Sequence, residues 1–232
     1  MSSKPISVLI TGANRGLGLE MVKQMVDTQS PLTPLSVLFA CCRDPDGPRA
    51  ERIHFFVLLL LDTADRSSIR QSAEQVGSLL GEKGLNLVIN NAAILINSTL
   101  VDSTPEDMAK TFNTNVIGPM SVIQEFLPYL RAAAKNSEVP GMSCRKAAVV
   151  NMSSIIGSIE NIQAIQKYLT AVPYRISKVN TLLILKEMYY LHTLAYFSGN
   201  ADHLFVKNVQ WECFVHFWTG KMHMLFCKLD FK

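Results

Sequence analysis

The sequence predicts a single α/β domain with a doubly wound parallel sheet flanked by helices. Three observations carry this prediction. Short β-rich apolar runs alternate with helical patterns, which is typical of parallel βαβ units. A glycine-rich turn, Thr11–Gly18, lies between the first such run and the first helical pattern. The length of 232 residues suits one domain, and a composition of 48% hydrophobic and 18% charged residues allows a sizeable core.

The predicted strands are short apolar runs bounded by polar or turn-forming residues. They are Ser7–Thr11, Val37–Cys41, Phe55–Leu61, Leu85–Asn90 and Ala147–Met152. The third is apolar on both faces, as expected of a buried parallel strand.

Helical patterns follow the first, third and fourth predicted strands. After the first strand, apolar residues from Leu17 to Val26 recur at a spacing of three to four, and Asp65–Leu80 has a similar pattern. Thr104 begins a third helix, because a capping hydroxyl is followed by Pro105 at the first helical position and by two acids near the positive end. Its apolar pattern runs on to Leu130.

The glycine-rich turn has the features of a phosphate-binding loop. Gly12, Gly16 and Gly18 follow the first predicted strand and open the first predicted helix. Glycine gives the freedom for a tight turn, lets a pyrophosphate approach the backbone and allows close packing of helix on strand. The positive end of the helix would then face the phosphates. An ordinary glycine-rich turn is the alternative, but the position between strand and helix favours a dinucleotide site in a Rossmann-type domain.

Five segments, in order along the chain, carry a resemblance to a known family. They are Thr11-Gly-x-x-x-Gly-x-Gly18, Asn90-Asn91-Ala92-Ala93, Asn115 within Thr114–Gly118, Ser153-Ser154, and Tyr174-x-x-x-Lys178. On these motifs, residues 6 to about 180 resemble the short-chain dehydrogenase/reductase family, and most of all its carbonyl-reducing branch with sniffer-like and C-factor-like proteins. The residues expected to hold the cofactor are Gly12, Asn14, Arg15, Gly16, Leu17, Gly18, Arg43, Asp62, Asn91, Ala92, Tyr174 and Lys178.

The end of the second predicted strand favours NADPH, with NADH the less favoured cofactor. NAD-preferring sites place an acid there to bond the ribose 2′-hydroxyl, whereas this chain has no acid before Arg43. Arg43 and Arg15 could converge on a 2′-phosphate, which carries close to two negative charges. Two solvated surface arginines are the alternative, and Asp44 could pair with Arg43 and weaken the effect. By resemblance, Asp62 would bond the adenine amino group.

Tyr174 and Lys178 form the expected centre of a carbonyl reduction. The developing alkoxide needs a proton, and an ordinary phenol with a pKa of about 10 is poorly matched to neutral pH. Lys178 lies one helical turn later on the same face, so its ammonium should lower the pKa of Tyr174. For a lone Tyr-x-x-x-Lys, the alternative is an ordinary amphipathic helix. By resemblance, Lys178 also holds the nicotinamide ribose, Ser154 bonds the substrate carbonyl, and Asn115 holds a water that relays protons to Lys178.

The C-terminal part departs from the family pattern. No proline follows Pro173, and Asp202–Trp211 could form a sixth strand only without the family's Pro-Gly turn. We therefore expect a sheet that is incomplete at its C-terminal edge, a nucleotide-binding domain over residues 1–196, and an atypical aromatic-rich segment over residues 197–232. The crossover at residues 42–54 is also short, with room for only a turn or two of helix.

These features predict NADPH-dependent reduction of a small aldehyde or ketone. The aberrant tail leaves an alternative: a catalytically weak or inert nucleotide-binding or interaction protein derived from a short-chain reductase. The two long helices predicted over residues 105–135 and 174–195 could pair across a homodimer interface.

Composition and patterning argue against several other classes. The net charge of +3 comes without a clustered basic face, so nucleic-acid binding is not expected. No apolar run approaches the length of a membrane span, and no signal-peptide pattern opens the chain. The five cysteines are irregularly spaced, as expected of reduced thiols. These three features together predict a cytoplasmic protein. The cysteines and histidines of the tail fit no zinc spacing, so no metal is expected.

Overall fold

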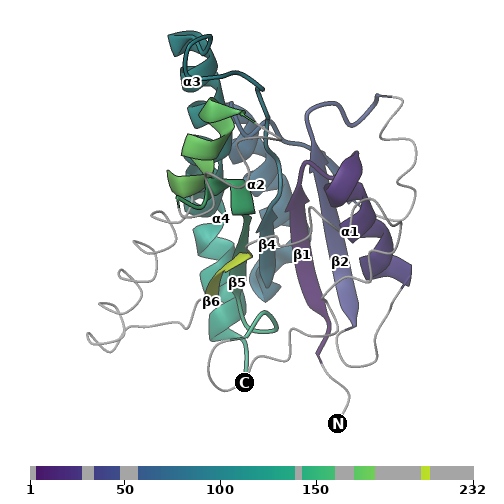
Figure 1. Ribbon diagram of the computed structural model, residues 1–232. Helices are drawn as coiled ribbons and strands as arrows, with labels where there is room; N and C mark the ends of the chain where they lie inside the picture. The colour runs from purple at the N-terminus through teal and green to yellow at the C-terminus, as the bar shows by residue number, and fades with distance from the viewer. Residues whose placement is uncertain are drawn as a thin grey trace.

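The chain folds around a twisted parallel sheet. The computed structural model describes residues 4–27, 34–47, 57–138, 143–159, 170–180 and 205–209. Within these residues, six strands form one sheet in the order β3-β2-β1-β4-β5-β6, with every neighbouring pair parallel (Figure 1). The strands are β1 (Ile6–Thr11), β2 (Leu35–Cys42), β3 (Val57–Leu60), β4 (Leu87–Asn90), β5 (Ala148–Met152) and β6 (Phe205–Val209). The strand order reverses at β1, which confirms a doubly wound, Rossmann-type fold.

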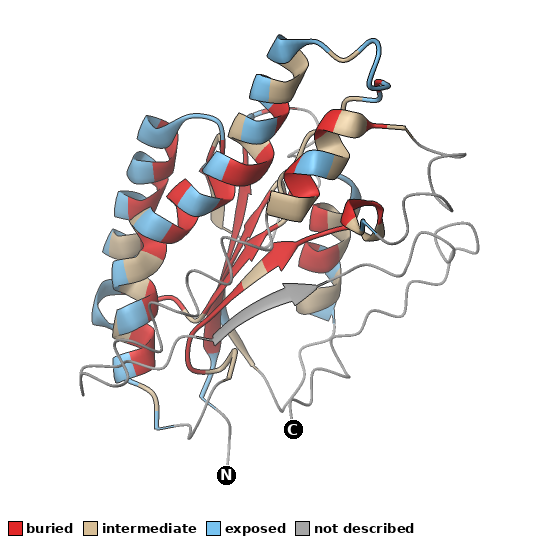
Figure 2. Ribbon diagram, turned by 60° about the vertical axis from the view of Figure 1, so that its left-hand side comes forward, coloured by how far each residue is buried: buried red, intermediate tan, exposed pale blue. Residues whose placement is uncertain are grey.

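Helices cover both faces of the sheet. Helix α1 (Gly16–Asp27) packs on one face, and α2 (Arg66–Leu80) and α4 (Gly118–Lys135) pack on the other. Buried residues line the strands and the inner sides of the helices, as Figure 2 shows. Phe39 and Phe126 are fully buried on the α2–α4 side, and Ile10 is fully buried on the α1 side. None of the helices in the described part of the chain has the length and apolarity to cross a membrane.

The helical pattern that begins at Thr104 is split by a wider turn. Thr104 caps α3 (Pro105–Phe112), and its side chain and that of Asp107 form a reciprocal capping box. A π-helical turn, η2 (Asn113–Ile117), then separates α3 from α4. The spacing of apolar residues predicts one continuous helix here. A π-helical turn accommodates one extra residue and changes that spacing only locally, so the pattern does not reveal it. Such turns often occur at functional sites, and this one contains Asn115.

The first five strands agree with the predicted bounds to within two residues at each end. The sixth strand, predicted within Asp202–Trp211, is present as β6 and continues the sheet beside β5, from Ala148 opposite Phe205 to Met152 opposite Val209. Part of the segment predicted to be atypical therefore continues the sheet. The rest of that segment, residues 48–54 of the short crossover and residues 181–195 of the last predicted helix lie outside the described residues.

Two short 3₁₀ turns complete the described elements. The turn η1 (Gly81–Lys83) follows α2, and η3 (Ile155–Gly157) follows β5. A helix over residues 172–180 carries Tyr174 and Lys178. Because η3 and this helix both lie beyond the carboxyl end of β5, they can bring polar side chains to the end of the sheet where ligands of open α/β folds bind.

Candidate active site

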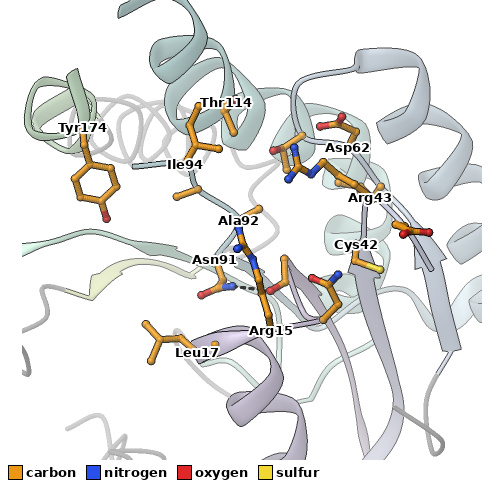
Figure 3. Close-up of a pocket in the computed structure, with 17 residues that line it drawn as sticks. Arg15, Leu17, Cys42, Arg43, Asp62, Asn91, Ala92, Ile94, Thr114 and Tyr174 are labelled. Atoms are coloured by element: carbon orange, nitrogen blue, oxygen red, sulfur yellow. Dashed lines mark hydrogen bonds between the residues drawn. The ribbon is translucent and has the colours of Figure 1, made fainter. Parts of the chain in front are cut away.

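A cavity of about 800 Å³ lies at the carboxyl ends of β1, β2, β3 and β4 (Figure 3). Most of the residues expected to hold a cofactor line it: Gly12, Asn14, Arg15, Gly16, Leu17, Arg43, Asp62, Asn91, Ala92 and Tyr174. Tyr174 lies toward one end of the cavity, and Arg43 and Asp62 lie toward the other. The cavity is also lined by Asp44, Ala93 and Thr114, for which the sequence predicted no role in holding the cofactor, and by Cys42, Leu61, Thr63 and Ile94, which were not predicted at the site. All but Thr114 lie at the end of a predicted strand or within four residues after it, and that position was a usable signal.

The glycine loop is shaped by close backbone contacts. Gly12 has φ +67°, and a Cβ there would lie 2.9 Å from Ala92 Cα. A Cβ on Gly18 would lie only 2.1 Å from the carbonyl oxygen of Gly12. Gly18 does not line the cavity, so its contribution is the close packing of α1 against the turn. The contact at Gly12 leaves no room for a side chain at the cavity wall, and the contact at Gly18 leaves none between α1 and the turn.

Thr11 and Asn91 fasten the glycine loop to the end of β4. The Thr11 hydroxyl accepts the backbone N–H groups of Asn91 at 3.1 Å and Ala92 at 3.0 Å. In return, Asn91 Nδ2 donates to the carbonyl oxygens of Thr11 at 3.0 Å and Gly12 at 3.2 Å. The Asn91 amide therefore holds the loop in shape, and Thr11 is a structural member of the site that sequence reasoning missed.

Gly18→Ala should destabilise the loop and weaken NADPH binding at least tenfold, because the new methyl group would overlap the Gly12 carbonyl. Gly81→Ala is a matched control. Gly81 has φ +55° but open space around its Cβ position, so this change costs backbone strain of about 1–3 kcal/mol without steric overlap, away from the cavity. Urea unfolding and fluorescence titration with NADPH measure both effects. A Gly18→Ala variant as stable as the parent, with equal affinity, would refute the packing role.

Both arginines expected at a 2′-phosphate are exposed at the cavity. Within the described part of the chain, no ion pair joins Arg15 or Arg43 to a carboxylate. The Asp44 carboxylate lies instead against Gly47, within 2.0 Å of where a Cβ would be. Asp62 also lines the cavity, and its Oδ1 accepts the Ala64 N–H at 2.9 Å. Positive charge from both guanidinium groups is thus open to an anionic ligand.

Tyr174 and Lys178 lie close together, as their spacing predicts, but their electrostatics differ from expectation. Lys178 Nζ lies 5.3 Å from the centre of the Tyr174 ring and donates to the Met152 carbonyl oxygen at 2.5 Å. Burial lowers the pKa of Lys178 to about 8, and burial raises the pKa of Tyr174. The expected lowering of the Tyr174 pKa is not found, because burial of the phenol raises that pKa instead.

Ser154 and Asn115 are buried beside this pair and do not line the cavity. Ser154 Oγ accepts the Ile156 N–H at 3.4 Å and so caps η3. The Asn115 side chain is held at both ends: Oδ1 accepts the Ile94 N–H at 2.9 Å, and Nδ2 donates to the Ile94 carbonyl at 2.9 Å and to Ser177 Oγ at 3.0 Å. Of the four expected catalytic residues, Tyr174 and Lys178 are on the helix over residues 172–180, Asn115 is bonded to Ser177 of that helix, and only Tyr174 lines the cavity.

The loop after β4 is fastened to the segment that precedes Tyr174. Asn97 Oδ1 accepts the Thr170 hydroxyl and the Ala171 N–H, both at 3.2 Å. The Val172 N–H donates to the Ser98 carbonyl at 3.0 Å. Ala171 has φ +31°, an unusual value for a residue other than glycine. The sequence did not predict that Asn97 joins these two segments, because its hydrogen-bond partners lie more than 70 positions away along the chain.

Comparison with known proteins gives consistent matches. The profile of the short chain dehydrogenase family matches residues 7–171. The structure is similar to an NADPH-bound carbonyl reductase from chicken fatty liver, with 35% identity and a TM-score of 0.77 over 90% of this chain and 76% of that one. It is also similar to the putative carbonyl reductase Sniffer of Caenorhabditis elegans, with 26% identity and a TM-score of 0.74 over 89% and 84% of the two chains.

Among curated proteins, similarity extends over part of each relative. A 3-ketodihydrosphingosine reductase of Bacteroides thetaiotaomicron is 30% identical over 154 residues, which is 66% of this chain and 49% of that protein. The human short-chain dehydrogenase/reductase family 9C member 7 is 31% identical over 155 residues, 66% of this chain and 44% of that protein. The chain therefore matches about half the length of these curated relatives.

Proposed function

The chain belongs to the short-chain dehydrogenase family, and we propose that it reduces a small aldehyde or ketone by hydride transfer from NADPH. The observation that carries this proposal is the cavity itself, which has a bare glycine loop and two exposed arginines along its wall and Tyr174 toward one end. Its position at the carboxyl ends of the strands is where a dinucleotide binds in this fold. The chicken relative of similar structure is an NADPH-bound carbonyl reductase.

The residues present fit an extended dinucleotide. The backbone of the Gly12 turn and the first N–H groups of α1 suit a pyrophosphate, because Gly12 and Gly16 line the cavity without side chains and α1 begins at Gly16. At one end of the cavity the exposed guanidinium of Arg43 suits a 2′-phosphate, and Arg15 adds positive charge on the same cavity wall. At the Tyr174 end, the nicotinamide ring would lie next to the phenol. The Asn91 amide supports this fit indirectly, since it is engaged by the loop.

When bound, the nicotinamide supplies the hydride. Tyr174 donates its phenolic proton to the carbonyl oxygen as negative charge develops there. Ser154 Oγ uses a lone pair to accept the Ile156 N–H, so its hydroxyl hydrogen remains available to the same carbonyl oxygen. Lys178 Nζ lies 5.3 Å from the centre of the ring, and its positive charge would favour the phenolate left behind.

Asn115 supports proton return through an oxygen atom. Both hydrogens of its amide are already donated, to Ile94 and Ser177. A relay water would therefore bind the remaining lone pair of Oδ1 or the backbone carbonyl, not the amide N–H groups. From there it would pass a proton toward Lys178, which lies one residue beyond Ser177.

Arg43→Asp should weaken NADPH binding by about 1–3 kcal/mol, the scale of a lost charge-assisted hydrogen bond, while NADH binding stays level or improves. The reason is that only NADPH presents a 2′-phosphate to this end of the cavity. Arg131→Asp is the control, because Arg131 is exposed on α4 outside the cavity and undergoes the same change in charge.

Equilibrium titration of the parent and both variants with NADPH and NADH, read by nicotinamide fluorescence, tests the cofactor assignment. The parent should bind NADPH more tightly than NADH. Equal losses for the two cofactors in Arg43→Asp, or an equal effect in Arg131→Asp, would remove the 2′-phosphate role from Arg43.

A further inference from the structure

Ser177 links two elements that carry the expected catalytic residues. Its side chain is almost fully buried, with 1% of its surface exposed. Its hydroxyl donates to the Tyr174 carbonyl oxygen at 2.7 Å within the helix over residues 172–180. The same oxygen accepts a hydrogen bond from Asn115 Nδ2 at 3.0 Å, across to the π-helical turn η2. One small side chain therefore joins the helix that carries Tyr174 to the turn that carries Asn115.

The link continues to the wall of the cavity. The other hydrogen of Asn115 Nδ2 goes to the Ile94 carbonyl, and Asn115 Oδ1 accepts the Ile94 N–H. Ile94 lines the cavity between Thr114 and Tyr174 in the view of Figure 3. The orientation of the Asn115 amide is thus fixed by three hydrogen bonds, and Ser177 provides the only one of them that does not come from Ile94.

The hydrogen bonds at position 177 require a hydroxyl group. Asn115 is 1% exposed, so an Nδ2 hydrogen without an acceptor there would be buried away from water. Serine can donate to a helical carbonyl three residues earlier and still accept through its lone pairs. Alanine can do neither. π-Helical turns are rare and occur mostly as single turns within α-helices, and the side-chain bonds of Asn115 tie η2 to Ile94 and Ser177.

We propose that Ser177 is a positioning residue, which locks the Asn115 amide and through it holds η2 and Ile94 in register with Tyr174 and Lys178. It touches no reacting atom. The effect on catalysis rests on the proposed function, because it acts through the geometry of the proton-transfer groups. The effect on Asn115 and Ile94 does not, since it follows from the hydrogen bonds alone.

The catalytic test compares three variants. Ser177→Ala should lower kcat about tenfold, the equivalent of one lost buried hydrogen bond, while the KM for NADPH stays within about twofold. Ser177→Thr should recover most of the loss, because a helical threonine can keep its hydroxyl bonded to the carbonyl three residues earlier. Ser121→Ala removes another buried serine hydroxyl, on α4 outside the cavity, and should leave kcat unchanged. Equal losses in Ser177→Ala and Ser121→Ala, or no recovery with threonine, would overturn the proposal.

A second measurement is independent of turnover. The Ile94 amide should exchange its hydrogen at least about tenfold faster in Ser177→Ala than in the parent, at similar global stability, because its acceptor Asn115 Oδ1 is released. Unchanged exchange at Ile94 would overturn the positioning role even in an active enzyme. If the parent reduces no carbonyl but Ile94 responds as expected, the proposed function fails and the positioning role stands.

Should Ser177→Ala not fold, the parent itself gives the test. Both side-chain amide protons of Asn115 should be protected from exchange with water in NMR spectra, because each is donated to a buried acceptor. An Asn115 amide that exchanges as fast as free asparagine would contradict the proposal.

Discussion

Tyr174→Phe should lower turnover by about 10²–10⁴-fold, the usual contribution of a general acid, and leave NADPH affinity nearly unchanged. The change removes only the hydroxyl. The ring, which is partly buried at the cavity, keeps its packing and can still contact the nicotinamide. Steady-state kinetics and NADPH titration on the same preparation separate the two effects.

Tyr129→Phe provides the matched control. Tyr129 loses the same hydroxyl but packs against Phe126, away from the cavity, with ring centres 6.3 Å apart. Its turnover should equal that of the parent. If Tyr174→Phe retained parental turnover in a clean preparation, Tyr174 would have no part in proton transfer.

Lys178→Met should abolish most turnover and yet stabilise the fold at pH 7. Burial lowers the pKa of Lys178 from 10.5 to about 8, which corresponds to a penalty on the order of 3 kcal/mol for keeping the ammonium in the folded protein. Methionine fills similar volume without charge. It leaves the Met152 carbonyl without its partner, so we expect a net gain of about 1–2 kcal/mol in the free energy of unfolding.

The stability difference between Lys178→Met and the parent should depend on pH. Because folding depresses the pKa of a cationic group, the penalty is fully present below pH 8 and disappears as the pH rises from about 8 to 10.5. The stability advantage of Lys178→Met should therefore shrink over that interval. Lys83→Met is the control, since Lys83 is exposed on η1 and should change stability by less than about 0.5 kcal/mol. A Lys178→Met variant less stable than the parent at pH 7 would contradict the account of buried charge.

Much of the fold could be predicted because its signals are local. Each of the first five strands is a continuous apolar run, and the glycine turn after β1 determines that a helix must begin at Gly16. The π-helical turn could not be predicted, since it arises where η2 must fit against Ile94 and Ser177, and those contacts join residues far apart in sequence. The sequence allowed a sixth strand within Asp202–Trp211 but could not establish it, because the family's Pro-Gly turn is missing; the structure has β6 there.

The sequence predicted most of the residues that line the cavity, but few of the contacts between them. The spacing of Tyr174 and Lys178 places them on one helical face, and the structure agrees. The pKa directions could not be foreseen, because they depend on how deeply both side chains are buried and on the Met152 carbonyl that receives the ammonium. Likewise, the Asn91 amide is used to hold Gly12, a contact that only the folded chain reveals.

The most direct test of the central claim is the oxidation of NADPH by the parent protein with a panel of small aldehydes, ketones and quinones. The account predicts that at least one carbonyl is reduced, with one alcohol formed for each NADPH consumed, and that this activity is lost in Tyr174→Phe. If the protein binds NADPH but consumes it no faster than a protein-free control across the whole panel, the chain is a nucleotide-binding protein without reductase activity, and the claim is wrong.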